Sequence, residues 1–166
     1  MATSETQDRE QFATAVANAE PGEIEASAVF QATQERLFRA LTTDEICDWW
    51  VRPGVFDTRE WTGDLREGGR WAASGVGGGQ PYKLEGEFVE ISEPHGLVHT
   101  WRAVGAPGGP AQVIYDLAPH PSGVRLTLRH TGIKNPDVLE KTRAGWVTSF
   151  ERLQQVLTSE RGASSE

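Results

Sequence analysis

Cysteine is almost absent from this sequence, since Cys47 is the only one among 166 residues. A single thiol cannot form a disulfide within the chain, and we expect Cys47 to pack in a helix rather than to act as a nucleophile. Long apolar runs are also missing, because none approaches the roughly 20 residues that a membrane-spanning helix needs. The N-terminus is polar and acidic, unlike a secretory signal peptide. These absences predict a cytoplasmic protein.

Basic residues are outnumbered, with 16 Lys and Arg against 24 Asp and Glu and a net charge of −8 at pH 7. Such a surface repels phosphate groups, so neither nucleic acid nor an anionic membrane is an expected partner.

Several motifs for catalysis and cofactor binding are missing as well. No spacing of His, Cys, Asp and Glu resembles a zinc site, and no Gly-x-Ser-x-Gly element marks a serine hydrolase. The glycine-rich stretch 75–79 lacks the Lys-Ser or Lys-Thr of a phosphate loop, so a hairpin turn or a mobile flap is the better interpretation. We therefore predict neither a metal nor a cofactor.

The longest regular pattern in the chain predicts an amphipathic helix from Asn135 to Ser159. Asn135 suits the N-cap, and Pro136 suits the first helical position because no amide hydrogen is needed there. Apolar residues then recur at spacings of three, four and seven, which indicates one buried face. These residues are Leu139, Trp146, Phe150, Leu153 and Leu157. We expect Gly162 to close the helix and residues 161–166 to form a tail.

The remaining pattern predicts one α+β domain over residues 23–160. A flexible extension, residues 1–22, should precede it and has a weak helical pattern around Phe12 and Val16. A first strand at Ile24–Phe30 is followed by two short helices, the first capped by Thr33 and the second introduced by the capping pattern of residues 42–45. From Thr58 onward the apolar period shifts towards two, which indicates strands. The expected strands are Arg59–Leu65, Arg70–Ser74, Tyr82–Ile91, Gly96–Arg102, Ala111–Pro119 and Gly123–Thr131. Short links between them predict an antiparallel, curved sheet that wraps the long helix.

The run Asp64-Leu65-Arg66-Glu67-Gly68-Gly69-Arg70-Trp71 resembles the strand–turn–strand signature of the family of activator of heat-shock protein 90 ATPase homologues, in the START-like or SRPBCC superfamily. Residues 85–91 and 97–101 are similar to the family's central hairpin, residues 125–132 to its last strand, and Gly145-Trp146 to its final helix. The resemblance covers roughly residues 23–160. It implies a helix-grip (START/Bet v-like) fold with six to seven antiparallel strands. It also implies either a cavity for lipids, hormones or polyketides, or a stress-response domain that activates a chaperone.

Six tryptophans are many for a chain of this length. Each combines a large apolar surface with one N–H donor, which suits a ligand cavity, although ordinary core packing is the alternative. His130 follows Leu128 on the apolar face of its strand, so it could contact a polar ligand group, transfer a proton, or be a core histidine. The orientation of His99 stays open, because Val98 is apolar too.

We expect a cavity between the sheet and the long helix, with its entrance in the loop after Trp50 that contains Gly54. The expected lining is Trp71, Tyr115, His130 and Trp146, with Trp49, Trp50 and Phe56 near the mouth.

Two functions stay open for this chain. The favoured one is binding of a hydrophobic or aromatic small molecule, with a polyketide cyclase-like enzyme as a catalytic variant that depends on His130. The other is a protein-interaction module that resembles the chaperone-activating domain, with a chaperone or another protein as its partner. The chain has no room for an additional domain that could clamp a chaperone, which favours the first function. A homodimer is an open alternative to a monomer under either function.

Overall fold

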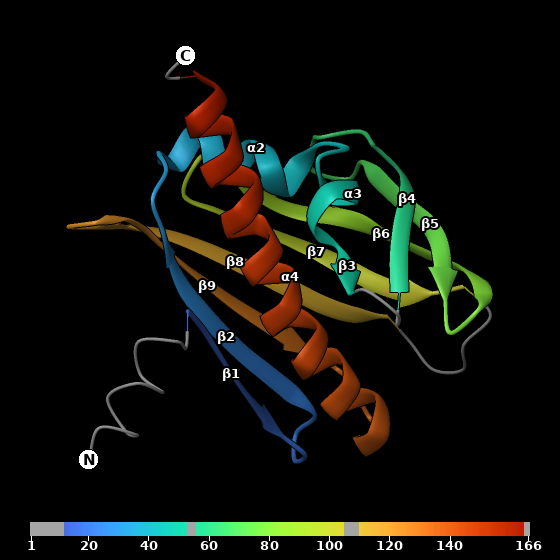
Figure 1. The fold of residues 1–166 in the computed structure, drawn as a ribbon. Coiled ribbons are helices and arrows are strands. Elements are labelled where there is room, and N and C mark those ends of the chain that lie inside the picture. Colours follow the sequence, from blue (N-terminus) through green and yellow to red (C-terminus); the bar gives the residue numbers. More distant parts are fainter. Residues whose placement is uncertain (1–11, 53–55, 105–109, 165–166) are drawn as a thin grey trace.

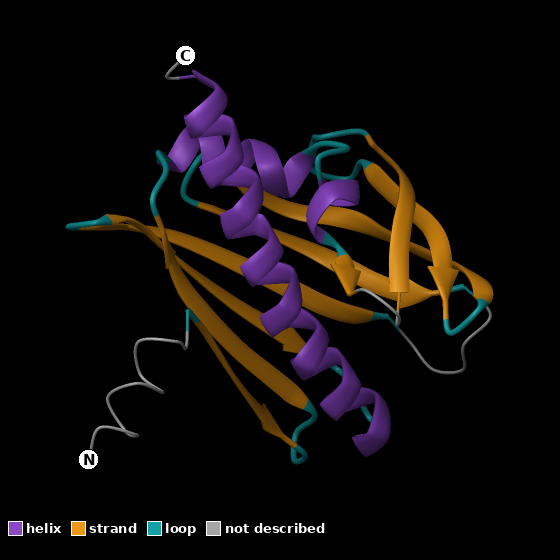
Figure 2. Cartoon of the chain, in the orientation of Figure 1, coloured by secondary structure: helices purple, strands orange, loops and turns teal. Residues whose placement is uncertain are grey.

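An antiparallel sheet curves around the C-terminal helix in the computed structural model, which describes residues 12–52, 56–104 and 110–164 (Figure 1). The elements follow one another in the order β1 (Ala13–Asn18), β2 (Glu23–Phe30), α2 (Gln34–Thr42), α3 (Ile46–Trp49), β3 (Val51–Arg52), β4 (Phe56–Gly63), β5 (Arg70–Gly77), β6 (Gln80–Ser92), β7 (Gly96–Ala103), β8 (Ala111–His120), β9 (Gly123–Thr131) and α4 (Pro136–Ser164). The predicted α+β class and the two short helices after the first long strand are confirmed. Figure 2 shows the helices gathered on one side of the strands.

Within the described residues the sheet has nine strands in the order β1-β2-β9-β8-β7-β6-β5-β4-β3. The prediction of six to seven strands omitted β1 and the two-residue β3. All neighbouring strands are antiparallel, and β2 lies beside β9, although these strands come from opposite ends of the chain. The pairing register shifts between Thr58 and Glu60 in β4 and between Phe88 and Glu90 in β6. Such irregularities bend strands and increase their twist, which helps the sheet to curve around α4.

Helix α4 begins where the sequence predicted, because the Asn135 side chain accepts hydrogen bonds from the amides of Asp137 at 2.9 Å and Val138 at 3.2 Å. The five residues of the predicted apolar stripe are all buried. The helix crosses the concave side of the sheet and contacts β1, β2, β3 and α3 (Figure 1). It runs through Ser164, so the expected closure at Gly162 is wrong, and residues 161–164 belong to the helix rather than to a tail.

The short helices form a second wall beside α4. Thr33 caps α2, since its hydroxyl oxygen accepts the amide hydrogen of Arg36 at 3.1 Å. The guanidinium of Arg36 donates to both carboxylate oxygens of Glu45, at 2.9 and 2.7 Å, which ties α2 to the start of α3. The indole of Trp49 donates to the carbonyl oxygen of Ala40 at 2.9 Å, so α3 is held with its tryptophans towards the interior.

The N-terminal residues from Ala13 onward are neither helical nor a flexible extension. Ala13–Asn18 pairs along its whole length with β2, and the ring of Phe12 packs edge-on against Phe30, with centroids 5.1 Å apart. The sequence pattern was misleading because the inward positions of β1 carry alanine, which gives little contrast with the outward ones. Residues 1–11 lie outside the described residues.

The glycine-rich stretch is a tight hairpin turn between β5 and β6. Gly77 pairs with Gln80, and the two glycines between them, Gly78 and Gly79, have φ values of 59° and 78°. Two-residue hairpin turns with positive φ at both positions favour glycine, which explains the composition of this segment. The proposed entrance loop around Gly54 is not described, since residues 53–55 lie outside the described ranges.

Replacing the buried ring of Phe150 should test how α4 docks. This ring lies edge-on to Phe30 with centroids 5.8 Å apart and 6.1 Å from Trp146. We expect Phe150→Ala to lower the unfolding free energy by roughly 3–5 kcal/mol, as measured by urea denaturation. Val138→Ala, at a half-exposed position of the same helix, is the control and should change it little. Equal denaturation midpoints for the two variants would contradict this docking.

A second pair of variants should test the docking of β1. Because the ring of Phe12 is partly buried against Phe30, Phe12→Ala should cost roughly 1–2 kcal/mol of unfolding free energy. Val16 is 59% exposed on the same strand, so Val16→Ala should have a much smaller effect. Thermal denaturation measures both. An unchanged melting temperature for Phe12→Ala would restore the interpretation of a loosely attached extension.

Candidate functional site

Aromatic side chains from α3, α4 and four strands meet between the sheet and the helices. We call this group the aromatic cluster and define it as Trp49, Trp50, Trp71, His99, Trp101, Tyr115, His130 and Trp146. Seven of its members are buried, and Trp101 is partly buried. The described buried residues of the whole chain include no Asp, Glu, Lys or Arg, so the cluster is an uncharged aromatic interior.

Trp50 lies at the centre of the aromatic cluster. Its ring contacts four other indoles, with centroid distances of 4.9 Å to Trp101, 5.7 Å to Trp71, 6.0 Å to Trp49 and 6.3 Å to Trp146. Three of these pairs are edge-on and the fourth is tilted, and aromatic quadrupoles favour such arrangements over face-to-face stacking. Trp49 and Trp50 were predicted to lie near an open mouth, but both are buried among their neighbours.

The N–H groups of the buried indoles differ in whether they have a partner. Trp49 donates to Ala40, Trp71 donates to the carbonyl oxygen of Thr100 at 3.1 Å, and Trp146 donates to Nδ1 of His130 at 3.1 Å. Nε1 of Trp50 is buried and has no hydrogen-bond partner among the described residues. A buried donor without a partner lowers the stability of the fold by about 1–3 kcal/mol relative to a paired donor. A ligand that brought an acceptor to this N–H would recover part of that free energy on binding.

The two histidines of the cluster stand on the same face of the sheet, with one strand between them. His99 is opposite Val113, which is in turn opposite His130, so the two Cα atoms are separated by two strand spacings, roughly 10 Å. Burial lowers the pKa of His99 to about 4, against a smaller opposing effect of its hydrogen bond to Thr100. Burial, with a smaller contribution from His99, lowers the pKa of His130 to about 3. Both imidazoles are therefore neutral at pH 7.

Six of the seven predicted site residues belong to the aromatic cluster: Trp49, Trp50, Trp71, Tyr115, His130 and Trp146. Burial raises the pKa of the Tyr115 phenol, which stays protonated. Phe56 lies apart from the cluster at the edge of α4, where a Cβ added to Gly145 would touch its ring at 3.5 Å. His99 and Trp101 were not among the residues predicted to line the site. Their alternation with Leu97 was the available signal, and the apolar Val98 between Leu97 and His99 obscured it.

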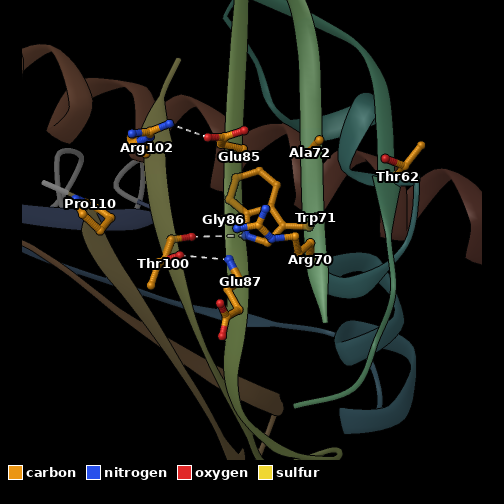
Figure 3. A pocket seen from close by; sticks show the side chains of 10 residues that line it. All are labelled: Thr62, Arg70, Trp71, Ala72, Glu85, Gly86, Glu87, Thr100, Arg102 and Pro110. Atoms are coloured by element: carbon orange, nitrogen blue, oxygen red, sulfur yellow. Dashed lines mark hydrogen bonds and ion pairs between the residues drawn. The ribbon is translucent and has the colours of Figure 1, made fainter. Parts of the chain in front are cut away.

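A second candidate site is a hollow of about 500 Å³ on the opposite face of the sheet, over β5, β6 and β7 (Figure 3). Gly86 and Glu87 have no paired residue in β7, and the amide of Glu87 donates to the Thr100 hydroxyl at 2.8 Å instead. A side chain at Gly86 would overlap the Thr100 carbonyl and the Trp71 indole nitrogen, so glycine permits their hydrogen bond. The exposed rim is charged, with Arg102 paired to Glu85 at 2.7 Å. This charged rim distinguishes the hollow from the uncharged aromatic cluster.

In the ranges that the structure describes, no three His, Cys, Asp or Glu side chains are grouped so that they could hold a metal ion. Across the same ranges, none of the helices combines the length and the hydropathy that are needed to span a bilayer.

A curved antiparallel sheet closed around a long C-terminal helix, with two short helices after β2, defines the helix-grip fold of the START-like (SRPBCC) superfamily. Residues 31–158 match the family described as Activator of Hsp90 ATPase homolog 1-like protein. The chain therefore belongs to this family, as its sequence motifs indicated. The family and the fold support a ligand-binding helix-grip domain in general. No functionally curated protein matches the chain.

Solved structures of similar proteins come from several bacteria. Protein CV1439 from Chromobacterium violaceum is 26% identical, with a TM-score of 0.73 over 82% of this chain and 96% of the other. The AHSA1 protein SPO3351 from Silicibacter pomeroyi is 23% identical, with a TM-score of 0.69 over 84% and 99% of the two chains. CalU16 from Micromonospora echinospora is 20% identical, with a TM-score of 0.60 over 91% and 87%. The latter two similarities establish the fold alone.

The buried histidines predict a loss of stability in acid. The unfolded chain takes up a proton on each imidazole near pH 6.5, whereas folded His130 does so only near pH 3. The contribution of neutral His130 to the free energy of unfolding is thus complete above about pH 6.5. It is lost as the pH falls towards 3, by up to roughly 1.4 kcal/mol per pH unit.

His130→Gln isolates this contribution, because the amide oxygen can still accept the hydrogen of Trp146. We expect urea denaturation to show a shallower decline for this variant than for the parent between pH 6.5 and 4.5. His120→Gln, at the half-buried last position of β8, is the control and should keep the parental decline. Parallel curves for the parent and His130→Gln would show that His130 is not buried as a neutral group.

Proposed function

We propose that this protein binds a hydrophobic or aromatic small molecule within the aromatic cluster, between the sheet and α4. The observation that carries the proposal is the buried, unpartnered N–H of Trp50 at the centre of that cluster. A core that served only for stability would gain from pairing or removing this donor. The same donor is useful in a site where a ligand supplies the acceptor.

The position of Phe56 suggests how a ligand could enter. Its ring is partly buried and lies against Gly145, the residue that precedes Trp146 on α4. Movement of this ring would open the side of α4 next to the cluster without disturbing the buried stripe of the helix. The close ring packing requires that Trp50 or Trp101 also shifts when a ligand enters.

A protein-interaction module, such as a chaperone-activating domain, is the second candidate. The packing of the indoles around Trp50 favours it, because the side chains then occupy the interior themselves and leave the outer surface for a partner. A cyclase-like activity has less support. With a pKa of about 3, His130 is a weak general base at neutral pH.

Indole N–H signals in a proton–nitrogen NMR correlation spectrum can test the binding proposal. We expect titration with α-tetralone, a small bicyclic ketone, to shift the signals of Trp50, Trp71 and Trp146 saturably. The signal of Trp61 should stay in place, because this partly buried ring lies over Gly63 and, among the described residues, pairs with no ring of the cluster. Single Trp→Phe variants assign each signal.

Two outcomes would contradict small-molecule binding in the cluster. One is a linear, non-saturating response at every tryptophan. The other is a saturable shift confined to Trp61, which would place the ligand beside β4 rather than in the cluster. If a diverse set of apolar compounds also leaves the cluster signals unchanged, the protein-interaction module becomes the better proposal.

A further inference from the structure

We infer that the ligand of the aromatic cluster is an uncharged molecule with a carbonyl oxygen, that the N–H group of Trp50 receives this oxygen, and that the N–H group of His130 is a second donor open to the ligand. The inference rests on the proposed function, since it specifies what the same site would take. It specifies the chemical class of the ligand and names Trp50 and His130 as the donors that the protein offers to it. Three features of the cluster support it: the unpaired indole, the tautomer of His130 and the absence of charge.

The first feature is the supply of donors. Three of the four fully buried indoles donate to protein atoms, and Trp50 is the exception. An acceptor in the cluster would satisfy this group, whereas a pure hydrocarbon would leave it unpaired.

The second feature is the tautomer of His130. An indole N–H can only donate, so Nδ1 of His130 must accept from Trp146 and carries no hydrogen. The neutral imidazole therefore has its proton on Nε2. No described residue accepts a hydrogen bond from this atom. Trp146 is thus a positioning residue, because it fixes which nitrogen of His130 is the donor.

His99 has the opposite tautomer. Its Nδ1 lies 2.9 Å from the carbonyl oxygen of Thr100, an acceptor, so this nitrogen must carry the hydrogen. The distal nitrogen of His99 is left as an acceptor. The two histidines therefore offer different groups to a ligand, and His130 is the one that can donate to an oxygen.

The third feature is the absence of charge. The buried polar residues in the described part of the chain are Thr42, Thr58, His99, His130 and Ser149, and none of them carries a charge when the histidines are neutral. A buried carboxylate without a counter-charge is strongly unfavourable. A neutral ketone can accept the hydrogen bond of Trp50 without that cost, so a carboxylate of the same shape should be excluded.

Three compounds with one bicyclic skeleton test this inference: tetralin, its ketone α-tetralone, and the matching tetralin carboxylate. We expect α-tetralone to bind roughly tenfold more tightly than tetralin, by the same NMR titration, because it satisfies buried donors. The carboxylate should not bind saturably. The indole proton of Trp50 should move downfield with the ketone and not with tetralin.

The variant Trp50→Phe removes the donor and keeps an aromatic ring. It should lower the affinity for α-tetralone to about that for tetralin, while Trp61→Phe should leave both affinities unchanged. Histidine nitrogen correlations should show the Nε2–H tautomer for His130 and the Nδ1–H tautomer for His99. The ligand comparison in the parent protein keeps the test decisive even if Trp50→Phe does not fold.

Equal affinities of tetralin and α-tetralone at the cluster would overturn this inference and leave the proposed function standing. Tighter binding of the carboxylate would overturn it too, since it would require a cation in the site. Absence of binding by all three compounds would count against the proposed function itself. An Nδ1–H tautomer of His130 would remove it as the second donor.

Discussion

The burial of one face of α4 against the curved sheet is the interaction on which the rest of this structure depends. The five buried residues of its stripe occupy the concave side, and they bring Trp146 opposite the sheet residues Tyr115 and His130. Hydrophobic burial of this kind is non-directional and supplies most of the stabilisation. The indole of Trp146 also donates a hydrogen bond to His130, which joins the helix to β9.

The aromatic cluster combines tight packing with an incomplete set of hydrogen bonds. Indole rings around Trp50 fill the space between α3, α4 and the sheet, yet the nitrogen at the centre has no partner. Natural cores usually pair such groups, so an unpaired donor suggests a functional compromise. The neutral histidines fit the same picture, because they contribute hydrogen-bonding groups to the interior without introducing a buried charge.

Thr100 links the two faces of the sheet. Its carbonyl oxygen accepts from Trp71 and from His99 inside the cluster, while its hydroxyl accepts from the Glu87 amide on the outer face (Figure 3). This arrangement replaces regular pairing between β6 and β7, and it needs Gly86, because any side chain there would occupy the same space. A change in ring packing inside the cluster could therefore alter the outer hollow through this one residue.

The sequence by itself determined the elements whose signals are local. The Asn135 cap, the spacing of the stripe in α4 and the alternation of β9 each depend on contacts within one segment, and all three were predicted correctly. Six of the seven proposed site residues also proved to be neighbours, because each lies on an apolar face that must point inward.

Only the tertiary structure decided the rest. Strand β1 forms through backbone pairing with β2, and its alanines carry no pattern that would reveal this. The enclosure of Trp49 and Trp50, the inward position of His99, and the isolated N–H of Trp50 depend on residues far apart in the chain. Hydrogen-bond partners and burial are properties of the assembled interior, so no local pattern encodes which donor is left without one.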